Sequence, residues 1–478
     1  MLFNSLNFLL FIPIVFILYW FVFQKLKYQN IFILIASYVF YGWWDWRFLS
    51  LILASTFVDY SLGLYLNKTE DKNKRKLFLF ASLLFNLGLL GIFKYYNFFI
   101  DNWINLWSSI GITMHKSSLN LILPVGISFY TFQTLSYTID VYRKNLKPTK
   151  DFIAFASFVS FFPQLVAGPI ERATNLLPQF YKKRAFSYDL AVSGVKLILW
   201  GFFKKIVIAD NCSIYVNDIF QNYQDQSGFT LTLGAIFFAF QIYGDFSGYS
   251  DIAIGVARLF GFNLMRNFNY PYFSRDIAEF WRRWHISLST WFRDYLYIPL
   301  GGSKGKKFKQ IRNVFIIFLV SGFWHGANWT FIFWGGLNAL LFIPLLLSNN
   351  NRKNMSIVAN NKYLPSLKEL FQMLVTFSLT TIAWIFFRAE TITIAFDYIK
   401  RIFVIENFSG IDYLPSIERF SFEIIFLIPI FLMFEWFYRN HETPFQGKLK
   451  HINELIILLM LFVFGSYSEY NSFIYFQF

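Results

Sequence analysis

Two histidines lie in strongly patterned parts of this 478-residue sequence and could do chemistry. The first is in the stretch GFWHGANW, where helical spacing would put Ser321, His325 and Asn328 on one face. Gly322 and Gly326 have no side chains and would leave space for a substrate beside that face. Imidazole suits proton abstraction from a hydroxyl, because its ordinary pKa lies near neutrality. We interpret His325 as a base, and the alternative is a structural histidine that bridges two helices.

The second histidine, His285, lies in the stretch EFWRRWHISLSTWFRDYLYIP. Helical spacing predicts that Arg282, His285, Ser289 and Arg293 follow one stripe of a helix over residues 276–299. This helix should lie at the membrane interface or re-enter the membrane.

Basic residues concentrate on and after this helix, at Arg282, Arg283, Arg293 and residues 304–309. They could bind the phosphates of an acyl-CoA or an acidic acyl-carrier protein. A surface helix anchored to anionic lipid head groups would show the same pattern. The sequence leaves both interpretations open.

Other kinds of catalytic site find little support. Asp245 and Asp251 are six positions apart and would point in different directions on a helix, so we expect them to anchor buried networks with nearby arginines. The sequence has no HExxH, Walker, dinucleotide or GxSxG motif, and its single cysteine excludes a thiolate zinc cluster. We expect no metal, and we expect an acceptor hydroxyl to attack a thioester directly, without a covalent acyl-enzyme.

The composition indicates how these residues are positioned. Hydrophobic residues make up 56% of the chain and charged residues 15%, against about 25% charged in a typical soluble domain. The bilayer must therefore solvate much of the surface, and helices are the spanning element that fits. The net charge of +15 follows from the basic bias of cytoplasmic loops and does not indicate nucleic-acid binding.

About eleven apolar stretches could span the membrane in one all-α polytopic domain covering residues 1–478. They are residues 6–23, 30–41, 48–66, 77–100, 121–140, 188–209, 229–262, 312–347, 371–387, 420–437 and 455–473. Basic clusters predict that residues 152–169 re-enter the membrane and that residues 312–347 form a hairpin. Gly335 and Gly336 would allow its bend, and His325 would lie well inside it.

Several long motifs, taken in order, resemble the membrane-bound O-acyltransferase (MBOAT) superfamily, in particular its bacterial alginate O-acetylase-like branch. They are PVGISFYTFQTLSYTIDVYR, FFPQLVAGPIER, YGDFSGYSDIAIGVARLFGF, the His285 stretch, GFWHGANW and WIFFRAET.

The resemblance implies helices around a central funnel, with His325 as the catalytic residue and His285 as a second motif histidine. Ser321, Trp324 and Asn328 are expected to support them. It also implies acetyl-CoA or another acyl thioester as donor and a polysaccharide acceptor. The resemblance further implies an extracytoplasmic SGNH-type partner and a multi-pass location in the bacterial inner membrane. The alternatives are transfer of D-alanyl or longer acyl groups, or a transporter or flippase of lipid-linked saccharide.

Overall fold

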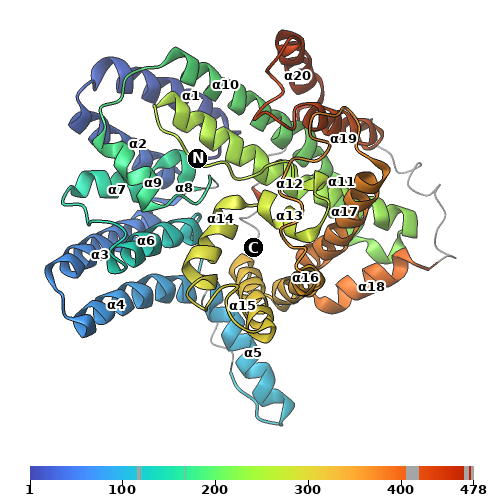
Figure 1. Ribbon diagram of the computed structural model, residues 1–478, viewed down its shortest axis with the longest axis horizontal. Coiled ribbons are helices and arrows are strands. Elements are labelled where there is room, and N and C mark those ends of the chain that lie inside the picture. Colours follow the sequence, from blue (N-terminus) through green and yellow to red (C-terminus); the bar gives the residue numbers. More distant parts are fainter. Residues whose placement is uncertain (116–118, 120, 167, 405–418, 468–472, 475–478) are drawn as a thin grey trace. The chain divides into compact units, whose positions relative to one another are not determined.

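The computed structural model describes residues 1–115, 119, 121–166, 168–404, 419–467, 473 and 474. Within these residues the chain forms helices and connecting loops without a β-strand (Figure 1). The predicted all-α class is confirmed. Residue 167 of the expected re-entrant segment and residues 468–472 of the last expected span lie outside the described residues.

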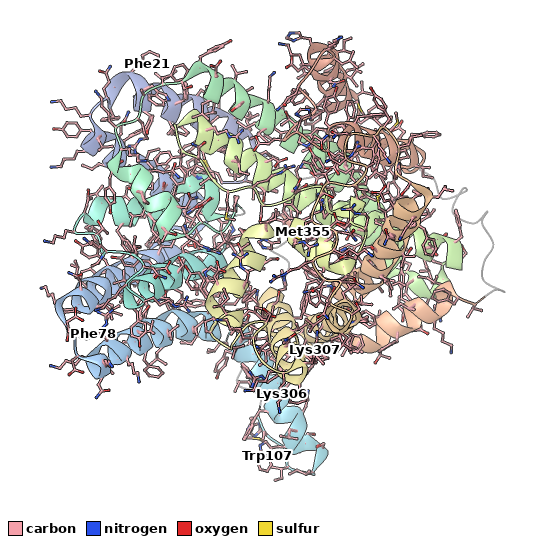
Figure 2. All side chains as sticks on the ribbon, in the orientation of Figure 1. Phe21, Phe78, Trp107, Lys306, Lys307 and Met355 are labelled. Carbon is pink, nitrogen blue, oxygen red and sulfur yellow. The ribbon has the colours of Figure 1, made fainter. Side chains whose placement is uncertain are left out.

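Apolar helices with outward-facing side chains support a membrane location. Five described helical runs are long and apolar enough to cross a bilayer: residues 26–68, 72–109, 228–259, 329–347 and 367–388. In an apolar 18-residue stretch of residues 72–109, only 17% is buried inside the protein. Phe21, in another apolar helix, is 70% exposed. Figure 2 shows such side chains along the outer sides of the helices. The predicted number of about eleven spans stays a prediction.

The chain divides into two compact units, and the first comprises residues 1–194 and 256–265. Its elements are α1 (Leu6–Ile17), η1 (Leu18–Val22), α2 (Leu26–Asp45), η2 (Trp46–Phe48), α3 (Leu49–Lys68), α4 (Lys72–Leu90), η3 (Gly91–Tyr95), α5 (Tyr96–Ser109), α6 (Ile127–Tyr142), α7 (Phe152–Ser160), α8 (Phe162–Leu165), α9 (Ala173–Leu176), η4 (Leu177–Tyr181) and the first part of α10 (Tyr188–Phe202).

A buried carboxylate joins three helices of the first unit. Asp59 on α3 accepts hydrogen bonds from Ser82, from Asn86 Nδ2 at 2.7 Å and from Thr138 Oγ1 at 2.8 Å. These donors lie on α4 and α6. Polar side chains of this kind hold membrane helices together because hydrocarbon offers them no other partner.

The second unit comprises residues 195–255 and 266–478 and contains both motif histidines. Its elements are η5 (Phe203–Ala209), α11 (Asp210–Gln221), η6 (Tyr223–Asp225), α12 (Gly228–Leu259), η7 (Pro271–Phe273), α13 (Ile277–Arg283), α14 (Ile286–Phe292), η8 (Arg293–Tyr297), α15 (Lys307–His325), α16 (Trp329–Leu347), α17 (Leu367–Arg388), α18 (Ile392–Ile402), α19 (Arg419–Phe437) and α20 (Lys450–Phe464). Whether the units form the single expected domain stays a prediction.

Buried ion pairs fix α12 to the π-helix η5. Lys205 Nζ lies 2.7 Å from Asp210 and 2.8 Å from Asp245, and Lys204 Nζ lies 2.6 Å from Asp251. The expectation that Asp245 and Asp251 anchor buried networks is confirmed. The ion pairs of these two aspartates are made by adjacent lysines of η5, Lys204 and Lys205, rather than by the expected arginines; Arg266 is close enough to act on Asp251 electrostatically.

Helices α15 and α16 form the expected hairpin and pack along each other (Figure 1). The expected bend at Gly335 and Gly336 was wrong, because the chain turns at residues 326–328. Gly335 instead allows close contact between the helices: a Cβ there would lie 2.3 Å from the carbonyl oxygen of Phe318. His325 is the last residue of α15 and lies at the tip of the hairpin rather than well inside it.

Two adjacent glycines of α16 provide a matched test of this packing. We expect Gly335→Ala to destabilise the protein by about 1–3 kcal/mol, because backbone atoms of α15 must move away from the new methyl group. Gly336→Ala should leave stability unchanged or raise it slightly, because its Cβ would meet only Leu319 Cδ2 at an ordinary 3.7 Å. Thermal unfolding of the two variants in one detergent compares them, and equal midpoints would contradict the packing argument.

Candidate active site

His285 lies at a break between two short helices. The single helix expected over residues 276–299 was wrong: α13 ends at Arg283, and α14 starts at Ile286. The break forms because a neighbouring segment supplies hydrogen bonds that would otherwise lie within the helix. Asn269 N donates to Arg283 O at 2.9 Å, and Ile286 N donates to Asn267 O at 2.8 Å.

The break forces His285 into the left-handed region, with φ 44° and ψ 54°. A non-glycine residue in this conformation costs about 1–3 kcal/mol, and such strain concentrates at functional sites. The strained backbone turns the imidazole into the protein interior, where His285 is 3% exposed. His285 therefore does not share one helical stripe with Arg282 and Arg293, which is what their spacing had predicted.

Asn267 sets the tautomer of this buried imidazole. His285 Nδ1 lies 3.1 Å from Asn267 Oδ1, and the same Oδ1 accepts the backbone N–H of Ser287 at 3.2 Å. A backbone N–H can only donate, so the shared atom must be the amide oxygen, and Nδ1 must donate to it. The lone pair of the neutral ring then lies on Nε2. No motif or periodic pattern pointed to Asn267, which is 18 positions before His285.

The protonation of His285 follows from its surroundings. The segment from α13 to η8 lies outside the helices that could span the membrane. Burial lowers the pKa of His285 well below its ordinary value of 6.5, and electrostatic repulsion from His325 lowers it further. The ring is therefore neutral near pH 7.

His325 is also buried, with 6% exposure, and aromatic rings surround it. Its imidazole packs edge-on against Trp334 at 5.4 Å between centroids and lies 5.4 Å from Phe387. Trp334 contacts Trp384 at 5.5 Å, and Trp384 contacts Trp284 at 5.0 Å. Because Trp284 directly precedes His285, a continuous chain of rings connects the two histidine segments.

The three supporting residues around His325 lie in different places. Ser321 is one helical turn before His325 on α15 and is buried, as its spacing predicted. The expectation that Asn328 shares this face was wrong, because α15 has ended: Asn328 caps α16 and accepts the N–H of Thr330 at 3.0 Å. Trp324 is partly buried beside His325. The chemical roles of all three stay predictions.

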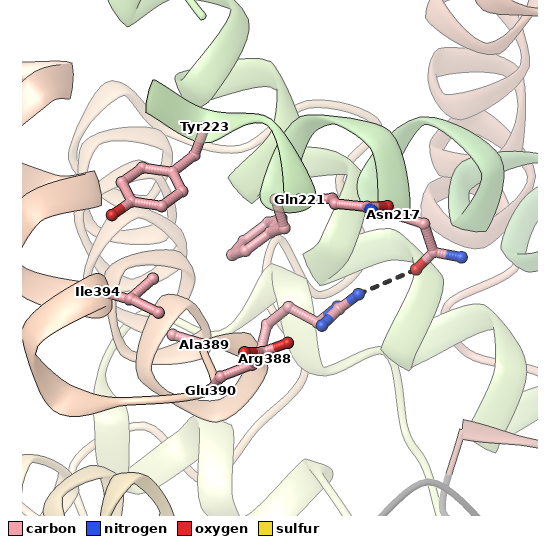
Figure 3. Close-up of a pocket in the computed structure, with 8 residues that line it drawn as sticks. Asn217, Gln221, Tyr223, Arg388, Ala389, Glu390 and Ile394 are labelled. Carbon is pink, nitrogen blue, oxygen red and sulfur yellow. Dashed lines mark hydrogen bonds between the residues drawn. The ribbon is translucent and has the colours of Figure 1, made fainter. Parts of the chain in front are cut away.

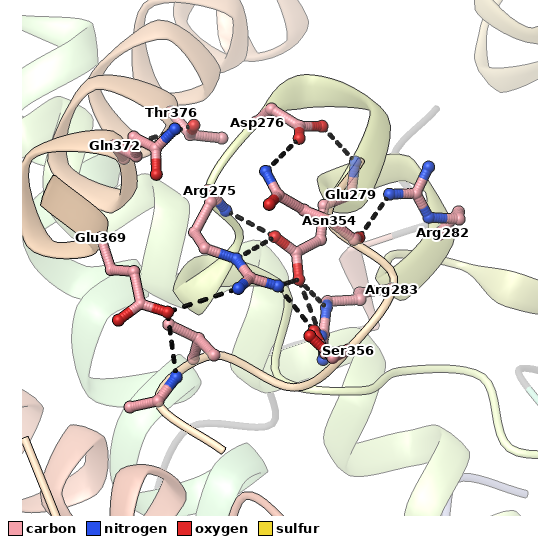
Figure 4. Close-up of polar contacts among 12 residues, drawn as sticks. Arg275, Asp276, Glu279, Arg282, Arg283, Asn354, Ser356, Glu369, Gln372 and Thr376 are labelled. Atoms are coloured by element: carbon pink, nitrogen blue, oxygen red, sulfur yellow. Dashed lines mark hydrogen bonds and ion pairs between the residues drawn. The ribbon is translucent and has the colours of Figure 1, made fainter. Parts of the chain in front are cut away.

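Two of the arginines predicted to bind the donor contact a loop between α16 and α17. Arg282 donates to Asn351 O at 2.7 Å and to Asn354 O at 2.8 Å. Arg283 Nη2 pairs with Glu279 Oε1 at 2.8 Å, and Arg275 Nε pairs with Glu279 Oε2 at 3.0 Å (Figure 4). The two arginines thus fix α13, which leads into His285.

Arg293, the third arginine predicted to bind the donor, is more accessible. Its side chain is 57% exposed and pairs with Asp294 at 2.7 Å. Donor binding by these arginines stays a prediction. The described residues contain no group of three or more histidine, cysteine, aspartate or glutamate side chains placed to hold a metal ion.

Comparisons with known proteins identify the family. The model of MBOAT, the membrane-bound O-acyltransferase family, matches residues 38–375. The chain is 41% identical over 406 residues to the probable alginate O-acetylase AlgI of Pseudomonas aeruginosa, covering 84% of this chain and 75% of that protein. It is 36% identical to the probable alginate O-acetylase AlgI of Pseudomonas putida over the whole of both chains. It is also 36% identical to the peptidoglycan O-acetyltransferase of Helicobacter pylori, covering 84% of this chain and 79% of that protein. With a helical membrane fold and two buried motif histidines, this chain belongs to the membrane-bound O-acyltransferase family and is an O-acyltransferase.

Proposed function

We propose that this enzyme transfers an acetyl group from a cytosolic acyl thioester to a hydroxyl of a cell-envelope or exported polysaccharide. The donor is acetyl-CoA or a loaded acyl-carrier protein. The relatives are named for alginate and peptidoglycan, which supports a glycan acceptor. The observation that carries the proposal is the pair of buried imidazoles, His285 and His325, in one aromatic cluster of one unit.

His325 acts as the general base in this proposal. Its imidazole takes the proton of the acceptor hydroxyl while the hydroxyl oxygen attacks the thioester carbonyl carbon. The new C–O bond forms, the C–S bond breaks, and the leaving thiolate takes the proton from the imidazolium to become a thiol. The surrounding rings exclude water that would otherwise compete with the acceptor hydroxyl.

His285 positions the acceptor hydroxyl in this proposal. Its neutral ring, with the lone pair on Nε2, can accept a hydrogen bond from a hydroxyl. The enzyme works in the bacterial inner membrane, and an extracytoplasmic SGNH-type protein receives the acyl group or delivers the glycan.

Reconstitution tests the proposed function. Purified enzyme in liposomes, with radiolabelled acetyl-CoA on one side and acceptor polysaccharide with an SGNH-type partner on the other, should yield ester-linked label on the glycan. Mild alkali should release this label, because it cleaves O-acetyl esters. Label that stays with the donor in every combination of acceptor and partner would contradict acetyl transfer to a glycan.

We expect His285→Ala to lower the transfer rate by about 10²-fold or more, because a buried hydrogen-bonding partner of the reaction is lost. His285→Asn separates chemistry from folding, since asparagine tolerates the left-handed conformation better than most residues. A folded His285→Asn variant that also loses transfer supports a direct role. Full activity in this variant would reduce His285 to a structural residue.

A further inference from the structure

A polar pocket lies in the second unit beside the loop that follows α17, with a volume of about 570 Å³ (Figure 3). Pockets of about 300–1,000 Å³ are typical of small-molecule sites. The side chains that define its character come from α11, from η6 and from the loop between α17 and α18. They are Asn217, Phe220, Gln221, Tyr223, Arg388 and Glu390.

The pocket combines hydrogen-bond donors and acceptors with the surfaces of aromatic rings. Arg388 Nη2 donates to Asn217 Oδ1 at 3.0 Å, and its guanidinium lies 5.5 Å from the centre of the Phe220 ring. Two such contacts hold the guanidinium, which has five N–H donors in all. Gln221, one helical turn after Asn217, adds an amide, and Glu390 adds a carboxylate acceptor.

This set of groups matches a saccharide better than a lipid or a nucleotide. Each sugar hydroxyl both donates and accepts, so a pocket with guanidinium, amide and carboxylate groups can satisfy several of them. The apolar C–H face of a pyranose packs on aromatic rings, which Phe220 and Tyr223 supply. A phosphate or nucleotide site would gather several cations, whereas this pocket combines one guanidinium with the carboxylate of Glu390.

The wall of this pocket is connected to the His325 hairpin. Phe387, which contacts the His325 imidazole, directly precedes Arg388, and Asn328 Nδ2 donates to Glu390 O at 2.9 Å. The pocket also lies at the C-terminal end of α17, about 33 Å along the helix from its start near Lys368, at about 1.5 Å per residue. If the basic segment before α17 faces the cytoplasm, the pocket opens toward the opposite side.

We propose that this pocket is an acceptor subsite, which binds a sugar unit of the polysaccharide other than the unit that is acylated. The inference rests on the proposed function. Binding energy from a remote unit would hold the chain so that one of its hydroxyls reaches His325. Longer acceptors should therefore bind better than short ones.

Binding measurements on the full chain in phosphatidylcholine nanodiscs test the subsite without any acyl transfer. The probes are alginate hexasaccharide, alginate disaccharide and cellohexaose, titrated by calorimetry. We expect at least one hexasaccharide to bind, and we expect Gln221→Ala and Arg388→Lys to weaken it about three- to tenfold by loss of hydrogen bonds. Asn222→Ala is the matched control, because Asn222 is exposed next to Gln221 and bonds to Asp218.

The outcomes distinguish this inference from the proposed function. A His325→Ala variant that binds the hexasaccharide as wild type does, while Gln221→Ala does not, supports the subsite. No binding of either hexasaccharide, or equal binding to wild type and Gln221→Ala, would overturn the subsite and leave the role of His325 untouched. If Arg388→Lys fails to fold, hexasaccharide binding by Gln221→Ala still tests the subsite, because Gln221 is exposed.

Discussion

Replacing His325 by alanine should abolish O-acylation while the protein remains folded in the membrane. General-base catalysis contributes about 10²- to 10⁴-fold, and the transfer rate should fall by at least this factor. The fold should survive because the imidazole lies at the end of α15, and the neighbouring rings still pack together without it: Phe387 contacts Trp334 at 5.2 Å and Phe331 at 4.8 Å between ring centroids. Acetyl release from labelled donor, measured with equal amounts of purified protein, gives the rate.

His325→Gln is the informative companion to this variant. Glutamine keeps a hydrogen-bonding side chain of similar length but cannot take a proton at neutral pH. A transporter or flippase would tolerate this change, whereas a base catalyst would not. Wild-type acetyl content in the polysaccharide of a strain that carries either variant would refute the assignment of His325.

Long apolar runs and short motifs predicted the helical fold and the two histidine segments well. The hairpin of α15 and α16 followed from basic clusters at both ends of one apolar stretch. Its turn did not, because Gly335 and Gly336 suggest a bend as readily as they suggest close packing. Only the partner helix, whose Phe318 carbonyl needs the space at Gly335, decides between these meanings.

The local geometry at His285 was beyond sequence reasoning for a different reason. The stretch around His285 has a regular helical pattern, and its residues alone favour one continuous helix. The break depends on Asn267 and Asn269, which replace the helical hydrogen bonds from outside the stretch. A hydrogen bond between residues 18 positions apart leaves no periodic signal, so neither the strained backbone nor the tautomer could be predicted.

The buried carboxylate Glu279 should be the most sensitive residue outside the aromatic cluster. It is 1% exposed and accepts hydrogen bonds from both Arg275 and Arg283 (Figure 4). Removing one partner of a buried ion pair leaves an uncompensated charge, which costs about 3–5 kcal/mol. We expect Glu279→Ala to lower the unfolding midpoint sharply and, because α13 leads directly into His285, to lower transfer by the protein that still folds.

A surface ion pair of similar length supplies the control for Glu279. Lys144 Nζ lies 2.7 Å from Glu70 Oε2, but the two side chains are 63% and 80% exposed. Water and salt already solvate both charges, so Glu70→Ala should leave the midpoint unchanged. The measurement is thermal unfolding of both variants in the same detergent. If Glu279→Ala unfolded at the wild-type temperature, its network would not hold α13, and the strained conformation of His285 would need another source of support within the second unit.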